Sequence, residues 1–185
     1  EVDLMASGRT DAGVHAFGQV ANFKTNSNIP IEKIPIALNS NLKKSIRIIS
    51  AEEVDERFHS RLTCKRKTYR YVINNSEFSS AIYRNLETHI PQKLDIEKMK
   101  QAAKYFEGEH DFKAFKASGT SSKSSVRIIY KAVVYEVPNN RIYIELTGNG
   151  FLYNMVRIIA GTLFDVGTGK IQPEDIEKII ESKDR

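Results

Sequence analysis

The chain has a single cysteine, Cys64, among its 185 residues, so it cannot form an intrachain disulfide. It has no run of about 18 apolar residues, which excludes a helix that spans a bilayer. Its first residues, EVDLMASG, lack the basic and apolar regions of a secretory signal peptide. With 41% hydrophobic and 28% charged residues, the composition is that of an ordinary globular protein. Together these features predict a cytoplasmic protein.

Several motifs of cofactor-dependent and hydrolytic enzymes are also missing. The sequence has no CxxC pair, no HExxH and no GxSxG. The segment GVHAFGQV has the glycine spacing of a phosphate loop, but Gln19 stands where such a loop needs a lysine. A metal site built from Asp11, His15 and His110 can be imagined, although such groupings are far more often ordinary polar contacts. We therefore expect neither a metal nor an organic cofactor.

The formal charge is mildly positive, with 28 Lys and Arg against 23 Asp and Glu, and one stretch concentrates the excess. Residues 61–70, RLTCKRKTYR, contain five basic residues and no acidic one. A basic stripe that includes a tyrosine suits a phosphate backbone together with a stacked base. An ordinary solvated strand face would have the same composition. The basic residues are Arg61, Lys65, Arg66, Lys67 and Arg70.

The spacing of apolar residues predicts both helices and strands. Alternation over 67–75 places Tyr69, Tyr71 and Ile73 on one face of a strand. Two β-rich runs around a Pro-Asn-Asn turn predict a hairpin over 126–148, which favours an antiparallel or mixed sheet. We therefore expect an α+β fold. Further strands are expected over 16–25 and 46–54, and helices over 29–42, over 95–108 with Asp95 as its cap, over 151–166 and over 173–184.

The stretch SGRTDAGVHAFGQ, residues 7–19, places Arg9 and Asp11 two residues apart, just ahead of an Ala-Gly pair. In a turn the two side chains can approach to ion-pair distance, and a neighbouring cation keeps a carboxylate ionised. Such a carboxylate can act as a nucleophile or as an electrostatic stabiliser. In the alternative interpretation, Asp11 only bonds to the backbone of its own turn.

Six short motifs follow one another along the chain. The first is RTDAGVHA, residues 9–16, and the others are RFHSR, KRKTYRYVI, GEHDFKAF, VRIIYKAVV and GNGFLYNMVRIIAGTL. These motifs resemble, in the same order, those of the tRNA pseudouridine synthase A family, and RTDAGVHA is similar to the loop typical of that family. The resemblance implies the pseudouridine synthase fold. That fold is a mixed, mainly antiparallel β-sheet with helices on one face and an active-site cleft across the sheet.

The same resemblance implies two α/β halves. Residues 1–60 would contain the catalytic loop, and residues 61–185 the basic strand, the hairpin and the helices. Family members normally begin with a strand and a Tyr-Asp-Gly-Thr stretch, and finish with an Ala-Pro segment and a last strand. We expect both ends to be missing here. A fragment of this kind leaves open an alternative function, that of a non-catalytic RNA-binding module of the same fold.

The activity implied by the resemblance is the isomerisation of uridine to pseudouridine at positions 38, 39 and 40 of the tRNA anticodon stem-loop. The glycosidic C–N bond breaks, the uracil turns, and a C–C bond forms to the same sugar. Because there is no redox change and no net hydrolysis, the reaction needs no cofactor. The family also works as a homodimer, in which one tRNA reaches across both subunits.

The resemblance assigns the catalytic role to Asp11. Arg9 and Arg157 would bind the substrate as cations near this carboxylate, and Tyr69 would receive the unstacked uridine. Arg157 stands in a largely apolar helix, so we expect it to be partly buried and paired. In the alternative interpretations Arg157 pairs with any surface acid, and Tyr69 fills a strand face as Tyr71 does. The five basic residues of 61–70 would hold the RNA backbone.

Overall fold

A computed structural model describes residues 2–119 and 124–184 of the chain. The chain divides into two compact units. Unit 1 comprises the residues up to Asp11 together with Ala16–Cys64, and unit 2 comprises Ala12–His15 together with the chain from Lys65 onward. The expected division into halves at residues 60 and 61 stays a prediction.

Unit 1 contains little regular structure. β1 (Met5–Ala6) pairs antiparallel with β2 (Ala21–Asn22), and η1 (Ile31–Lys33) continues into α1 (Ile34–Asn41). Pro35 stands in the first turn of α1, where a helix tolerates its missing N–H. Among the described residues of unit 1, only Ser60 is buried, and every apolar side chain is at least partly exposed.

Two strand predictions for unit 1 are corrected by the structure. Residues 46–54 form neither helix nor strand, and the strand expected over 16–25 is reduced to β2. An apolar run becomes a strand only where a neighbour takes up its backbone hydrogen bonds. Here the side-chain amide of Asn39 accepts from the N–H of Ile48 at 2.8 Å and donates to its carbonyl at 2.9 Å. The segment is therefore tied to α1 by one side chain instead of pairing with a strand.

Unit 2 is built on a five-stranded sheet with the order β4-β3-β7-β6-β5. Neighbouring strands are antiparallel except for the short parallel pair of β3 and β4. The α+β class and the mixed, mainly antiparallel sheet are therefore confirmed. The strands are β3 (Lys67–Asn74), β4 (Thr88–His89), β5 (Gly108–Asp111), β6 (Val126–Val137) and β7 (Arg141–Gly148).

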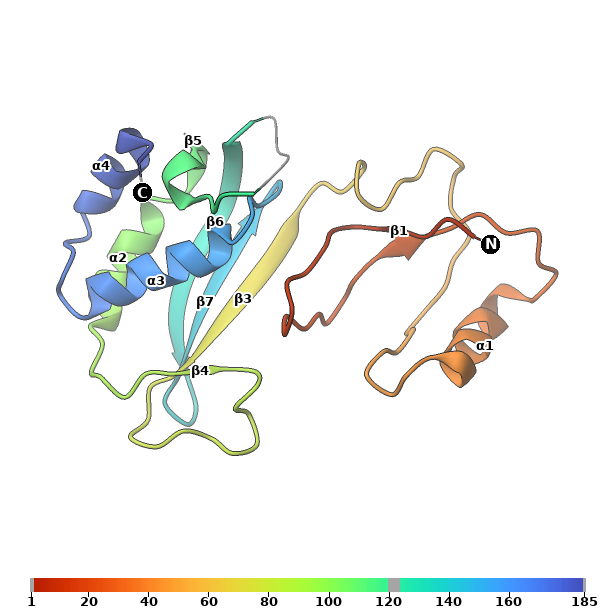
Figure 1. The fold of residues 1–185 in the computed structure, drawn as a ribbon, viewed down its shortest axis with the longest axis horizontal. Coiled ribbons are helices and arrows are strands. Elements are labelled where there is room, and N and C mark those ends of the chain that lie inside the picture. Colours follow the sequence, from red (N-terminus) through yellow and green to blue (C-terminus); the bar gives the residue numbers. More distant parts are fainter. Residues whose placement is uncertain (1, 120–123, 185) are drawn as a thin grey trace. The chain divides into compact units, whose positions relative to one another are not determined.

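The helices of unit 2 lie on one face of this sheet (Figure 1). Ile142, Ile144 and Leu146 of β7 are buried on the helix side, whereas the residues between them point to the other face. Within the described part of the chain, no helix has the length and apolar character needed to cross a membrane. The helices are α2 (Ile96–Lys104), η2 (Phe112–Phe115), α3 (Met155–Gly167) and α4 (Asp175–Ser182).

Local signals set the ends of several elements. Asp95 caps α2 as predicted, because its carboxylate accepts from the N–H of Lys98 at 3.0 Å. The turn between β6 and β7 has left-handed backbone at Asn139 and Asn140, which suits a tight hairpin. The helix expected from residue 151 begins four residues later, because Asn154 has a φ of 57° and interrupts the helical backbone.

Candidate active site

The loop with Arg9 and Asp11 connects β1 to β2. Asp11 directly precedes a turn at Ala12 and Gly13. Gly13 has a φ of 79°, a backbone conformation that favours glycine over residues with a side chain. The predicted turn after Asp11 is therefore present, and the side chains of Arg9 and Asp11 are both exposed.

Hydrogen bonds hold the two arms of this loop together at its base. The N–H of Ser7 donates to the carbonyl of Val20 at 2.8 Å. The side chain of Gln19 adds two bonds: its amide donates to the carbonyl of Gly8 at 2.8 Å, and its oxygen accepts from the Ser7 hydroxyl. In the sequence, Gln19 stands out only as the residue in the position where a phosphate loop needs a lysine. In the structure it closes the loop that carries Asp11.

A second clamp comes from the RFHSR motif. The buried hydroxyl of Ser60 donates to the carbonyl of Met5 at 2.8 Å, and the N–H of Ser60 donates to the side chain of Asn22 at 2.9 Å. Ser60 therefore joins β1 to β2 from a position 38 residues beyond Asn22. Apolar periodicity gives no signal for Ser60 or Gln19. Only their places within the quoted motifs single them out.

In unit 2 the structure brings Tyr69 next to the segment that carries Arg157. Tyr69 is half-buried on β3, and its ring meets that of Phe151 edge to face with centroids 5.1 Å apart. Phe151 leads into α3, which contains Arg157. Tyr71, by contrast, packs against the core and shares a hydrogen bond of 2.7 Å with Thr88. Tyr71 thus has the structural role that the alternative interpretation gave to both tyrosines.

The expectation that Arg157 is partly buried is wrong. Its side chain is exposed, although Val156 and Ile158 on either side are apolar and half-buried. Successive residues of a helix point about 100° apart, so one exposed position between apolar neighbours is geometrically ordinary.

Asp11 belongs to unit 1, whereas Tyr69 and Arg157 belong to unit 2. The meeting of all three in one cleft stays a prediction.

The basic residues of 61–70 have different surroundings. Arg61 belongs to unit 1, and Lys65 and Arg66, both exposed, belong to unit 2. Arg70 is paired: its guanidinium lies 2.6 Å from the carboxylate of Glu145 and 4.5 Å from the ring centre of Tyr143. The hydrogen bond to Glu145 raises the pKa of Arg70. Arg70 is exposed, but Glu145 offsets part of its charge before any RNA is bound.

The motif GEHDFKAF serves the fold. The ring of His110 makes a hydrogen bond of 2.9 Å to the carbonyl of Glu107. The carboxylate of Asp111 accepts from the N–H of Lys113 at 3.2 Å, which caps η2. Within residues 2–119 and 124–184, no three or more His, Cys, Asp or Glu side chains are grouped so that they could hold a metal ion.

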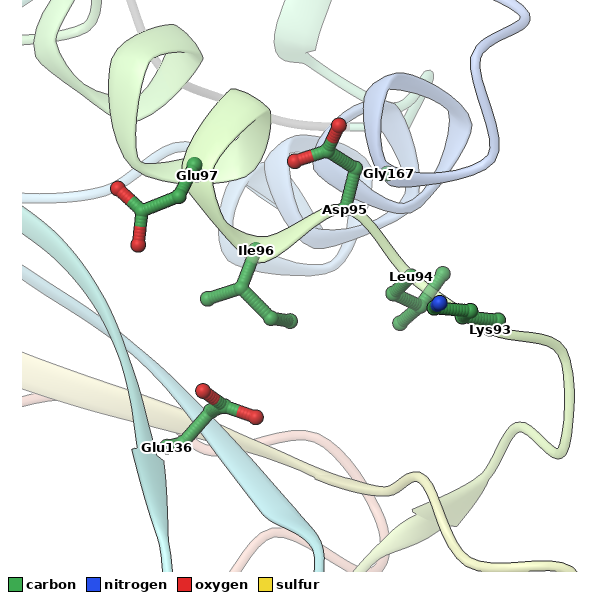
Figure 2. A pocket seen from close by; sticks show the side chains of 7 residues that line it. All are labelled: Lys93, Leu94, Asp95, Ile96, Glu97, Glu136 and Gly167. Carbon is green, nitrogen blue, oxygen red and sulfur yellow. The ribbon is translucent and has the colours of Figure 1, made fainter.

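A shallow hollow of about 460 Å³ lies where α2 begins and α3 ends (Figure 2). Ile96 and Glu136 face one another across it, and Asp95 and Glu97 add two more carboxyl groups. Such a set of carboxylates repels the phosphate backbone of a nucleic acid. No residue predicted for the active site lines this hollow, and we assign it no role.

Comparison with known proteins identifies the family to which this chain belongs. The sequence model described as tRNA pseudouridine synthase matches residues 1–62 and 102–185. The tRNA pseudouridine synthase A of Thermoanaerobacter sp. (strain X514) is 52% identical over 185 residues, which are 100% of this chain and 75% of that protein. Those of Acetivibrio thermocellus and Bacillus pumilus are 52% and 46% identical, and the match covers 75% and 74% of their lengths and 100% of this chain. The chain is therefore an isomerase that belongs to the tRNA pseudouridine synthase family.

Proposed function

We propose that this chain converts uridine to pseudouridine at positions 38, 39 and 40 of the tRNA anticodon stem-loop, with Asp11 as the catalytic residue. The observation that carries the proposal is 52% identity, over all 185 residues, to a protein named tRNA pseudouridine synthase A. The family model covers the loop of residues 9–16, in which Asp11 stands. The Gly13 turn and the clamps at the base of that loop support a fixed position for its carboxylate.

An aspartate suits this reaction because it is ionised at neutral pH and can attack a carbon atom or accept a proton. The bond between C1′ and N1 of the uridine breaks, the uracil turns, and a bond forms between C1′ and C5. A proton leaves C5, and N1 gains one, so no outside oxidant or reductant is needed. Gln19 and Ser60 hold the loop at its base, which limits the range of positions that the Asp11 carboxylate can occupy.

Under this proposal Tyr69 receives the uracil after it leaves its stack, because an aromatic face can replace the stacking lost from the RNA. The edge-on contact with Phe151 supports that role, since it holds the Tyr69 ring in one orientation. Arg9 and Arg157 bind the negatively charged substrate through their positive charge. Both arginine side chains are exposed, as contact with a large substrate requires.

The phosphate backbone is held by Arg61, Lys65, Arg66 and Lys67, with a smaller contribution from Arg70 because of its pair with Glu145.

The chain acts as a homodimer with one tRNA reaching across both subunits. Two basic surfaces then act on one ligand, so a formal charge of only +5 per chain suffices. A cytoplasmic location suits a protein with one free cysteine.

The test is the release of tritium from C5 of labelled uridine in tRNA. The parent chain should release tritium, and Asp11→Ala should reduce the rate by at least about 10³-fold while it keeps tRNA affinity. Asp3→Ala is the matched control, because Asp3 is another exposed aspartate of unit 1. Unchanged turnover by Asp11→Ala would remove Asp11 from the chemistry. Binding of tRNA without release by the parent chain would leave the non-catalytic RNA-binding module.

A further inference from the structure

We propose that Lys65, Arg66 and Tyr130 form a second nucleotide site on unit 2. A base stacks on the ring of Tyr130, and the adjoining phosphate contacts Lys65 and Arg66. These three residues line a hollow of about 280 Å³. The site rests on the proposed function in one respect, since its ligand is part of the same RNA.

A β-bulge turns Tyr130 out of the sheet. Ile129 of β6 pairs with Gly148 of β7, and Lys131 pairs with the adjacent Thr147, so Tyr130 is an extra residue in the ladder. As a result Tyr130 and Lys131 are both exposed, which breaks the alternation of the strand. Bulges re-aim side chains in this way and are common beside functional sites. Tyr130 is 52% exposed, so a large part of the residue is open to solvent.

The strand register brings Tyr130 close to the basic segment. Lys67, the first residue of β3, pairs with Gly148, which in turn pairs with Ile129. β3 and β6 are therefore two strand spacings apart at this level, which is about 10 Å. Lys65 and Arg66 come directly before Lys67, and their long side chains can cover much of that distance. Residues far apart in the sequence thus line one hollow at the beginning of β3.

The chemistry of the lining fits one nucleotide of unpaired RNA. The three residues carry two positive charges and no negative charge. A tyrosine face stacks on any base, and lysine and arginine contact phosphate without reading sequence. The volume of the hollow is slightly smaller than the roughly 300–1,000 Å³ of pockets that enclose small molecules. This small volume favours an open surface on which a base stacks. A base within a duplex could not reach such a surface, whereas a base in a loop can.

The hollow is distinct from the place proposed for the target uridine. Tyr69 does not line it. The nucleotide bound there is therefore not the one that is isomerised. A second unpaired nucleotide held at this point would fix the anticodon loop on unit 2 and so favour RNA with an open loop over plain duplex.

The experiment measures binding of a fluorescent anticodon stem-loop RNA to the full chain at several salt concentrations. Tyr130→Ala should weaken binding about tenfold at each salt concentration, and Tyr130→Phe, which keeps the stacking face, should bind like the parent. Lys65→Gln should reduce the slope of log affinity against log salt by about 1. Arg70→Gln should reduce that slope less, because Glu145 already offsets part of the charge of Arg70.

Phe78→Ala is the matched control, because Phe78 is an exposed aromatic residue of unit 2 that follows the other end of β3. Equal affinities of Tyr130→Ala and Phe78→Ala would overturn the site. A Tyr130→Ala variant with a changed oligomeric state and unchanged RNA affinity would also overturn it, since the hollow would then contact a second copy.

Tritium release separates this site from the proposed function. A chain that needs Tyr130 for RNA affinity but releases no tritium keeps the site and loses the proposed function. A chain that isomerises uridine and binds RNA equally well without the Tyr130 ring keeps the function and loses the site.

Discussion

Tyr69 and Phe151 meet edge to face, with ring centroids 5.1 Å apart and an angle of 82° between the ring planes. The contact links β3 to the residues that lead into α3. Edge-to-face pairs contribute about 0.5–1.5 kcal/mol of stability in addition to the free energy gained from the area that they bury. The orientation of the tyrosine proposed to receive the uracil thus depends on its contact with Phe151.

Phe151→Ala should lower kcat for uridine isomerisation about tenfold and change KM less, because Tyr69 loses the neighbour that orients it. Phe151→Tyr keeps an aromatic ring and should restore most of the rate. Steady-state tritium release from tRNA measures both constants. Equal kcat values in the alanine and tyrosine variants would show that this contact does not position Tyr69.

Gln19→Glu should slow isomerisation about tenfold with little change in melting temperature. A carboxylate cannot donate a hydrogen bond to the carbonyl of Gly8, so the loop with Asp11 loses one of the bonds at its base. Gln101→Glu is the control, because Gln101 is an exposed glutamine of α2. If both variants turn over tRNA at the parent rate, the bond from Gln19 has no part in positioning Asp11.

Two glycine substitutions in unit 2 should change stability in opposite directions. A Cβ on Gly148 would lie 2.7 Å from the backbone oxygen of Ile128, so Gly148→Ala should cost about 1–3 kcal/mol of unfolding free energy. A Cβ on Gly161 in α3 meets nothing within 4 Å, so Gly161→Ala should gain up to about 1 kcal/mol. Urea titration of both variants measures these changes. Similar midpoints would contradict the tight approach of β6 to β7 at Gly148.

The pH dependence of stability should include a contribution from Asp111. The hydrogen bond from Ser125, together with the ion pair to Lys183, lowers the pKa of Asp111 against the opposing effect of burial. A lowered pKa stabilises the fold above the unfolded-state value of about 3.9, and this stabilisation is lost as the pH falls through the folded-state value.

Urea unfolding between about pH 2 and pH 6 tests this contribution, because the decline in stability on acidification should be smaller in Asp111→Asn. The asparagine keeps an oxygen that can accept from the N–H of Lys113, so the cap of η2 is retained. Parallel pH profiles of the parent and the variant would exclude Asp111 as a source of acid sensitivity.

Elements of unit 2 with strong local signals could be predicted from the sequence. Alternation predicted that Tyr69, Tyr71 and Ile73 share one face of β3, and the capping side chain of Asp95 marked the start of α2. Neither signal depends on distant residues. The strand expected over 46–54 failed for the opposite reason, since a strand exists only with a partner and Asn39 supplies the hydrogen bonds of Ile48 instead.

The supporting residues of the candidate site, and the tyrosine of the second proposed site, could not be predicted from patterns. Gln19 and Ser60 act through hydrogen bonds across the β1–β2 pair, and Tyr130 depends on a bulge in the pairing of β6 with β7. Such relationships join residues that no periodicity connects. The exposure of Arg157 was also mispredicted, because the composition of a helix does not say which way one residue points.

The side chains on the sheet face away from the helices also keep β7 in a single alignment. Arg70 reaches Glu145 and the ring of Tyr143, and that ring meets Tyr135 with centroids 5.6 Å apart. Sliding β7 by one residue would exchange its two faces, so that Glu145 entered the apolar layer and Ile144 left it. Contacts on this face of the sheet therefore help to fix the register of the three central strands. A hairpin shifted by one residue would lose these contacts and would also bury the carboxylate of Glu145.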